Sequence, residues 1–165
     1  DSILDHHDQR RIFAPGEVRT VRDQIGSALV YGHEQGVIHR DVNQKNILFG
    51  EKATLIDYGI PDSMEQTSNS QGCICGTKGY IAPEIWSLQK TGPASDLFGL
   101  GVVLFEMLTR RMAPRESIIF QDWFDSCLNG FDAPPGLKDS IKNLISNDPH
   151  LRAQGLQESN SSERG

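Results

Sequence analysis

The spacing of apolar positions predicts a mainly helical chain with one small β-hairpin. The first apolar stripe recurs every three or four residues, the period of a helix with one buried face: Val18, Val21, Ile25 and Leu29. Residues 14–17 bring a proline and a glutamate just before this stripe, and both suit the first turn of a helix. We therefore expect a helix that begins near Pro15.

Four later segments complete the predicted organisation. Residues 47–49 and 53–56 are short apolar runs on either side of a turn, which predicts a strand, a turn and a strand. The run 97–108 is apolar nearly all round, so it should form a buried helix, and 137–145 carries the stripe of an amphipathic helix. Residues 154–165 are polar and predict a disordered tail, so the expected domain covers residues 1–153.

Composition and charge narrow the class of protein. The chain has 165 residues, a length typical of one domain, and 37% of them are hydrophobic. Its 16 basic and 22 acidic residues give a net charge of −6, which argues against a partner that is nucleic acid or an anionic membrane. No apolar run is long enough to span a bilayer. Three cysteines make no disulfide framework, so we expect an intracellular protein, in the cytoplasm or the nucleus.

Short polar motifs follow the predicted elements in a fixed order. His-Arg-Asp-Val-Asn-Gln-Lys-Asn occupies residues 39–46, between the first helix and the hairpin, and Asp-Tyr-Gly at 57–59 follows the second strand. Gly-Thr-Lys-Gly-Tyr at 76–80, Ala-Pro-Glu at 82–84 and the Asp-x-x-Gly-x-Gly pattern at 96–101 come later. In this order, the motifs resemble the eukaryotic protein kinase family, serine/threonine type. The resemblance covers residues 1–153.

The resemblance implies a fold and a reaction. The expected fold is the mainly α C-terminal lobe of the kinase-like α+β fold, with the N-terminal β lobe absent. The expected reaction is transfer of phosphate from ATP, with Mg²⁺, to Ser or Thr of protein substrates. Asp41 matches the catalytic base, Asn46 and Asp57 match the Mg²⁺ ligands, Leu48 matches the residue beneath adenine, and Thr77 matches the hydroxyl that bonds the base. Carboxylate and amide oxygens are suitable ligands for Mg²⁺.

The resemblance also assigns structural residues. Glu84 is expected to pair with Arg152, and Asp96 is expected to bond the backbone of residues 39–46. His39 and Tyr58 are expected to stack in the core behind the site.

The chain departs from the family pattern at some positions. Many serine/threonine kinases carry lysine where this chain has Asn43, and that lysine meets the γ-phosphate. Lys45 either supplies this positive charge or is a solvated surface residue, and the sequence leaves both interpretations open. Tyr58 replaces the commoner phenylalanine, so its hydroxyl needs a partner. Gly59 lets the chain turn sharply after the preceding motif residues.

Arg40 lies directly before the predicted base, an arrangement of family members whose activation loop is ordered by phosphate. A phosphate on Thr67, Ser68 or Ser70 would pair with this guanidinium. The alternative is that these three hydroxyl residues are unmodified loop residues.

The chain shows no glycine-rich phosphate loop and no strand lysine before Asp41. We therefore expect the N-lobe of the same domain to lie in a parent chain, and we expect the 165 residues alone to have little or no kinase activity. Two functions stay open: a fragment of an active kinase that binds ATP and protein substrates, or a catalytically inactive, pseudokinase-like lobe that acts as a protein-interaction module.

Overall fold

The computed structural model describes residues 1–58, 76–87, 91–114 and 121–158. Its α-helices are α1 (Ile3–Asp8), α2 (Pro15–Glu34), α3 (Pro83–Trp86), α4 (Pro93–Thr109), α5 (Gln121–Asn129) and α6 (Pro135–Leu144). Two 3₁₀ helices, η1 (Gln44–Asn46) and η3 (Pro149–Leu156), and two strands, β1 (Ile47–Phe49) and β2 (Ala53–Leu55), complete the described elements. The predicted fold class is confirmed: the described chain is mostly helical, with one antiparallel strand pair.

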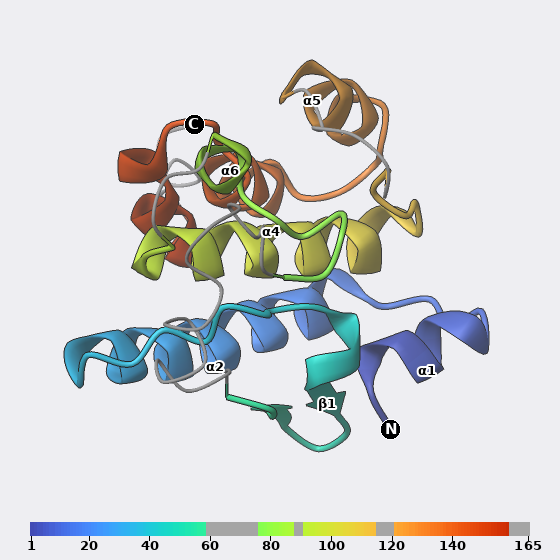
Figure 1. Ribbon diagram of the computed structural model, residues 1–165. Helices are drawn as coiled ribbons and strands as arrows, with labels where there is room; N and C mark the ends of the chain where they lie inside the picture. Colours follow the sequence, from blue (N-terminus) through green and yellow to red (C-terminus); the bar gives the residue numbers. More distant parts are fainter. Residues whose placement is uncertain (59–75, 88–90, 115–120, 159–165) are drawn as a thin grey trace.

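Helix α4 forms the centre of the molecule, with α2 on one side and α6 on the other (Figure 1). Every residue from Asp96 to Thr109 is buried, which agrees with the apolar run that predicted this helix. Gly101 allows the close approach of α6, because a Cβ there would lie 2.7 Å from atoms of Leu144 and Ile145. The absence of a side chain at Gly101 therefore lets α4 and α6 pack closely at this point.

Helix α2 begins at Pro15, as the sequence predicts. The Glu17 side chain accepts a hydrogen bond of 2.9 Å from the backbone N–H of Ala14, which satisfies a donor at the start of the helix. The four stripe residues are at most 1% exposed: Val18, Val21, Ile25 and Leu29.

The hairpin joins the N-terminal segment to the rest of the lobe. Ile47 pairs with Leu55 and Phe49 with Ala53, and these four side chains face inward and are buried. Helix α1, which the apolar pattern did not predict because it has only six residues, lies beside β1 (Figure 1). The backbone N–H of Phe49 donates to the carbonyl of Asp1 at 3.0 Å, so the start of the chain extends the pairing of the hairpin.

Residues 154–158, which the sequence analysis placed in the polar tail, make defined contacts in the structure. Residues 154–156 belong to η3, and Leu156 packs against the core beside Gly26 of α2. Glu158 accepts hydrogen bonds from Arg19 at 2.5 Å and from Arg22 at 2.9 Å. The polar composition of this segment gave no sign that Leu156 packs against the core or that Glu158 binds two arginines. Residues 159–165 lie outside the described part of the chain.

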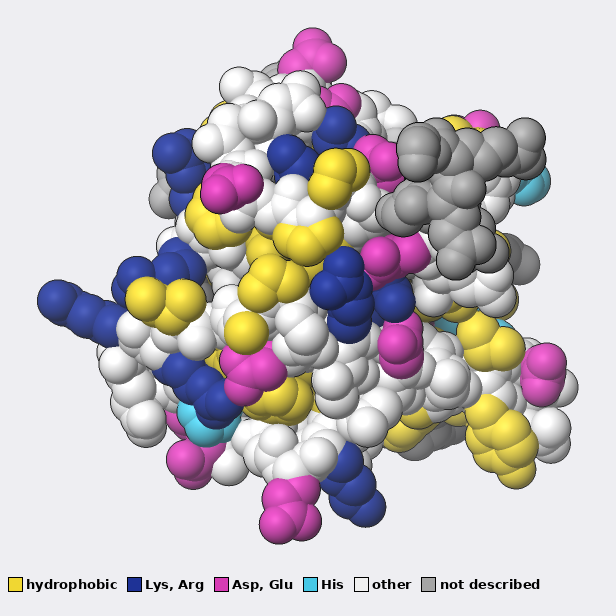
Figure 2. All heavy atoms as spheres, turned by 180° about the vertical axis from the view of Figure 1, so that it is seen from behind, with side chains coloured by type: hydrophobic (Ala, Val, Ile, Leu, Met, Phe, Trp, Pro, Cys, Tyr) yellow, Lys and Arg dark blue, Asp and Glu magenta, His cyan; other side chains and the backbone are white. Residues whose placement is uncertain are grey.

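None of the described helices has the length and hydrophobicity needed to cross a membrane. Acidic and basic side chains are interspersed on the face that Figure 2 shows, although the chain carries a net charge of −6.

Candidate active site

Asp96, in the first turn of α4, binds the backbone of loop 39–46. This residue is 2% exposed. Its two carboxylate oxygens accept the backbone N–H groups of His39 and Arg40, both at 2.8 Å. His33, in the last turn of α2, donates to the same carboxylate at 2.8 Å. Arg40 has a φ of 73°, in the left-handed region, and these hydrogen bonds offset the strain of that backbone. Asp96 thus sets the path of the chain just before Asp41.

Close packing fixes the same loop two residues further on. A Cβ on Gly99 of α4 would lie 2.7 Å from the carbonyl oxygen of Val42 and 3.1 Å from its Cβ. The backbone of α4 therefore touches the backbone of loop 39–46 directly, and no larger residue fits between them.

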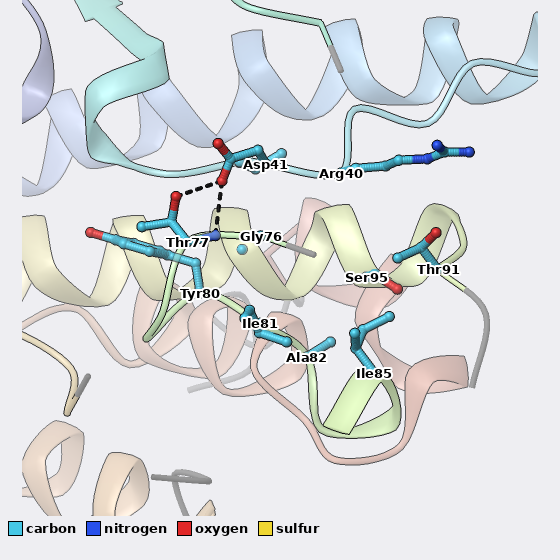
Figure 3. Close-up of a pocket in the computed structure, with 12 residues that line it drawn as sticks. Arg40, Asp41, Gly76, Thr77, Tyr80, Ile81, Ala82, Ile85, Thr91 and Ser95 are labelled. Atoms are coloured by element: carbon cyan, nitrogen blue, oxygen red, sulfur yellow. Dashed lines mark hydrogen bonds between the residues drawn. The ribbon is translucent and has the colours of Figure 1, made fainter. Parts of the chain in front are cut away.

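Asp41 points toward the segment that begins at residue 76, and Thr77 holds it there (Figure 3). The Thr77 hydroxyl donates to Asp41 Oδ1 at 2.6 Å, and the Thr77 backbone N–H donates to the same oxygen at 3.1 Å. The Asn46 amide donates to the Asp41 carbonyl at 2.8 Å and reaches Asp41 Oδ2 at 3.4 Å. The contact between Thr77 and Asp41 is the one that the resemblance implied.

A pocket lies between loop 39–46 and the chain from Gly76 to Ile85, with Asp41 on its wall (Figure 3). Ile81, Ala82 and Ile85 line its apolar side. A carboxylate beside an apolar hollow can hold a hydroxyl group while the neighbouring part of the same ligand is desolvated.

The two predicted magnesium ligands are neighbours. The backbone N–H of Ile56 donates to the carbonyl of Asn46 at 2.8 Å, so Asp57 comes directly after a residue bonded to Asn46. Because the Asn46 amide nitrogen donates to Asp41, its oxygen remains available as a ligand. Asp57 is exposed, and its φ of 55° turns the chain sharply. Two hard oxygen ligands fit Mg²⁺, which commonly takes its other ligands from phosphate and water.

His39 links this turn to the loop. Its Nε2 donates to the carbonyl of Ile56 at 2.8 Å, and its Nδ1 accepts the backbone N–H of Asp41 at 3.2 Å. These two contacts fix the tautomer, because a carbonyl can only accept and an N–H can only donate.

Tyr58 corrects the expectation of a stacked pair in the core. Its ring meets His39 edge to face, with centroids 4.8 Å apart, and its side chain is 45% exposed. The hydroxyl reaches the carbonyl of Ala28 at 3.5 Å, a long contact. Partial burial raises the pKa of Tyr58, and the charge of Asp96 adds to this shift. Because the side chain is nearly half exposed, its hydroxyl is not forced to find a partner inside the protein.

The expected ion pair between Glu84 and Arg152 is present, with Arg152 buried and Glu84 partly buried. The guanidinium donates to the two carboxylate oxygens at 2.6 and 2.8 Å, and it also donates to the carbonyls of Ala94 and Ser146 at 2.9 Å. Burial by itself raises the pKa of Glu84, but hydrogen bonds and the charge of Arg152 outweigh it and hold that pKa below its usual value. The pair joins α3, at the end of the pocket segment, to η3 and α4.

The protein kinase domain model matches residues 1–159 of the chain. This chain belongs to the protein kinase domain family. It is 35% identical over 129 residues to protein kinase C eta type of Mus musculus, covering 77% of the chain and 19% of that protein. It is 36% identical over 104 residues to serine/threonine-protein kinase PLK2 of Mus musculus, covering 62% of the chain and 15% of that protein. The chain thus spans less than a fifth of the length of these curated relatives.

The structure also places other residues that the sequence analysis of this kinase domain singled out. Lys45 is exposed, and within the described part of the chain its one hydrogen bond runs from its backbone N–H to Asn43 Oδ1 at 2.9 Å. Leu48 faces outward from β1 and is 39% exposed. Arg40 lines the pocket. The predicted Gly59 and the hydroxyl residues Thr67, Ser68 and Ser70 lie outside the described residues.

Sequence reasoning missed a buried polar cluster beside the site. Glu106 of α4 is fully buried, and it accepts hydrogen bonds from Gln44 and from the Tyr80 hydroxyl at 2.5 Å each, and from the Ala113 N–H at 2.8 Å. The cluster joins loop 39–46, the pocket segment and the end of α4 in this kinase domain. The available signal was a single glutamate in the run 97–108, which is otherwise apolar.

Proposed function

We propose that this chain is the catalytic-loop part of a serine/threonine protein kinase domain, which in its parent protein transfers the γ-phosphoryl group of ATP to protein substrates. The observation that carries the proposal is the position of Asp41. One of its oxygens is held by Thr77, and its side chain faces a pocket with an apolar wall. The relatives with serine/threonine kinase names support the choice of Ser and Thr as acceptors.

The residues of the chain have distinct tasks in this reaction. Asp41 orients the substrate hydroxyl and takes its proton as the hydroxyl oxygen bonds the γ-phosphorus. The bond between that phosphorus and the bridging oxygen breaks at the same time, and ADP leaves with that oxygen. Ile81, Ala82 and Ile85 contact the substrate beside the acceptor residue.

ATP and Mg²⁺ are the cofactors of the proposed reaction. Asn46 and Asp57 would hold Mg²⁺, which supplies charge neutralisation on the phosphates when it is bound. Leu48, which is exposed on the outer side of β1, would lie beneath the adenine, and the N-lobe of the same domain would cover it. An intracellular location suits this proposal, because ATP is consumed there.

We also propose roles for the two cations Lys45 and Arg40. Lys45 would supply the positive charge near the γ-phosphate that Asn43 does not carry. Arg40 would bind a phosphate on Thr67, Ser68 or Ser70. Replacement of Lys45 by methionine should lower turnover strongly without unfolding the domain, and unchanged turnover would make Lys45 a surface residue.

The deciding experiment measures transfer of labelled phosphate from ATP to a panel of Ser and Thr peptides. It uses the longest natural chain that contains residues 1–165. Asp41→Asn should lower kcat at least about 100-fold, the usual contribution of a general base. Asp132→Asn is the matched control, because Asp132 is exposed and remote from the pocket. Asp57→Ala should abolish the Mg²⁺-dependent reaction. Equal activity of the wild type and Asp41→Asn would refute the proposal.

A protein-interaction module without activity is the second candidate. One observation favours it: Asn43 is neutral where many family members have a cation for the γ-phosphate. A parent chain that folds and binds protein partners but transfers no phosphate at any Mg²⁺ concentration would establish this alternative.

A further inference from the structure

Asn43 lies at the centre of the contacts that hold Asp41. Its side chain is 2% exposed, and its amide nitrogen reaches three acceptors: Asp41 Oδ1 at 2.9 Å, the Asp41 carbonyl at 3.1 Å and the Thr77 hydroxyl at 3.1 Å. Its amide oxygen accepts the backbone N–H of Lys45 at 2.9 Å and so caps η1. Both ends of one buried amide are therefore in use.

The orientation of this amide follows from its neighbours. The backbone N–H of Lys45 can only donate, so the atom of Asn43 that faces it must be the oxygen. The nitrogen then faces Asp41, whose carboxylate can only accept. The hydrogen bond from Lys45 to the amide oxygen of Asn43 thus directs the amide nitrogen toward Asp41.

Thr77 closes a ring of three side chains. Its hydroxyl accepts from the Asn43 amide at 3.1 Å and donates to Asp41 Oδ1 at 2.6 Å. A hydroxyl has one hydrogen, so the bond from Asn43 leaves that hydrogen free to go to Asp41. Asn43 therefore acts on Asp41 both directly and through Thr77.

The two oxygens of Asp41 differ as a result. Oδ1 receives hydrogen bonds from the Asn43 amide, the Thr77 hydroxyl and the Thr77 backbone. Among the residues that the structure describes, Oδ2 has only the 3.4 Å contact with Asn46. A carboxylate oxygen offers about two lone-pair directions, so Oδ1 has no room for a further donor.

We infer that Asn43 is a positioning residue that saturates Oδ1 of Asp41 and thereby makes Oδ2 the atom that takes the proton of the substrate. This inference rests on the proposed role of Asp41 as the base. An amide performs the task without adding charge, so it aligns the carboxylate and leaves the charge of the γ-phosphate to other groups.

Asn43→Asp tests the donor end of the side chain separately from its acceptor end. An aspartate keeps an oxygen for the Lys45 N–H, but it lacks the donor and places a second carboxylate beside Asp41. Asn43→Ala removes both ends, and Asn43→Ser keeps a small group that can cap and donate. Asn147→Asp is the matched control, because Asn147 is exposed and its side chain has no hydrogen bond with the described residues. Far-UV circular dichroism and melting curves establish that each variant is folded.

Amide hydrogen exchange in the 165-residue chain tests the geometry without any activity. Asn43→Asp should speed exchange of the Thr77 amide at least about tenfold, which is the loss of one hydrogen bond of typical strength, and leave the Lys45 amide protected. Asn43→Ala should speed exchange of both amides. If Asn43→Asp leaves Thr77 unchanged, or if both amides change together in that variant, Asn43 is only a helix cap and the inference is wrong.

Kinetics in the parent chain test the selection of Oδ2. Asn43→Asp should lower kcat about 10- to 100-fold while KM for ATP stays within about twofold, because alignment of the base acts in the transition state. Asn43→Ser should recover part of this loss, which a purely structural residue would not explain. A normal kcat together with faster Thr77 exchange would overturn the inference. If the wild-type parent transfers no phosphate, the proposed function fails, and the exchange experiment still decides whether Asn43 positions Asp41.

Discussion

On one face of α4, loop 39–46 is held by hydrogen bonds to Asp96 and by backbone contact at Gly99. On the other face, α6 lies against Gly101 through apolar side chains, and the Arg152 guanidinium lies 5.1 Å from the centre of the Phe98 ring. The first face is joined to its neighbour by directed polar contacts to the backbone. The second is joined by close packing beside the partly buried ion pair of Glu84 and Arg152.

The two faces of α4 contribute differently: one fixes the position of loop 39–46, and the other stabilises the fold. Apolar packing has no preferred direction, so many arrangements of side chains stabilise the face toward α6 almost equally. The hydrogen bonds of Asp96 exist only for one backbone path, which includes the left-handed residue Arg40. We call the face of α4 toward α6 the scaffold face. We expect variants on the scaffold face to lower the stability of the fold, and variants on the opposite face to change the position of loop 39–46.

The largest expected effect is on the scaffold face. Arg152→Leu should lower the free energy of unfolding by about 3–5 kcal/mol, because it leaves the partly buried Glu84 carboxylate without its cation. Urea denaturation followed by circular dichroism measures this loss. The double variant Glu84→Gln with Arg152→Leu should recover much of it. An unchanged midpoint for the single variant would show that the pair does not hold the pocket segment.

Two alanine substitutions on the same helix compare the faces directly. Gly101→Ala should cost about 1–3 kcal/mol, because a methyl group 2.7 Å from Leu144 and Ile145 overpacks the core. Gly99→Ala should instead displace loop 39–46, since its methyl group meets the backbone of Val42. Chemical-shift changes in amide NMR spectra should be largest in loop 39–46 for Gly99→Ala and in α6 for Gly101→Ala. The same pattern of shifts in both variants would contradict the separation of the faces.

Acid should weaken the scaffold face. The pKa of Glu84 lies below its usual value because the contacts of Arg152 outweigh the effect of burial, and the pKa of Glu158 is lowered by hydrogen bonds from Arg19 and Arg22. A carboxylate with a lowered pKa in the folded state stabilises the fold above its ordinary pKa of 4.5, and this stabilisation is lost as the pH falls through the lowered value. Urea midpoints should therefore fall below about pH 5.

Variants identify the groups responsible for this pH dependence. Glu158→Gln should flatten the dependence in part, and Asp132→Asn, at an exposed position, should leave it unchanged. A midpoint that does not vary between about pH 5 and pH 3.5 would contradict the assignment.

The smallest effect is expected at Tyr58. Tyr58→Phe should change the free energy of unfolding by less than about 0.5 kcal/mol, because its hydroxyl makes only a 3.5 Å contact and the side chain is 45% exposed. Thermal melting measures the change. A loss of more than about 1 kcal/mol, the worth of an ordinary hydrogen bond, would mean that this hydroxyl helps to hold loop 39–46.

The helical core could be predicted because its signal is periodic. The stripe of α2 and the apolar run of α4 are buried as expected, and both follow from the burial of one or all faces of a helix. Helix α1 and the ordered contacts of Glu158 were missed, because the first is too short to show a period and the second depends on two arginines far away in the sequence.

The sequence by itself determined the family, the helical scaffold and the order of the motif residues. Residue types and their spacing are sufficient for these, since they are local properties of the chain. Only the tertiary structure decided that Asn43 joins Asp41 to Thr77 and that Glu106 accepts hydrogen bonds from Gln44 and Tyr80. It also decided which oxygen of Asp41 has fewer donors among the described residues. Hydrogen bonds are directional and join residues that are distant in the chain, so their partners are settled only when the elements pack.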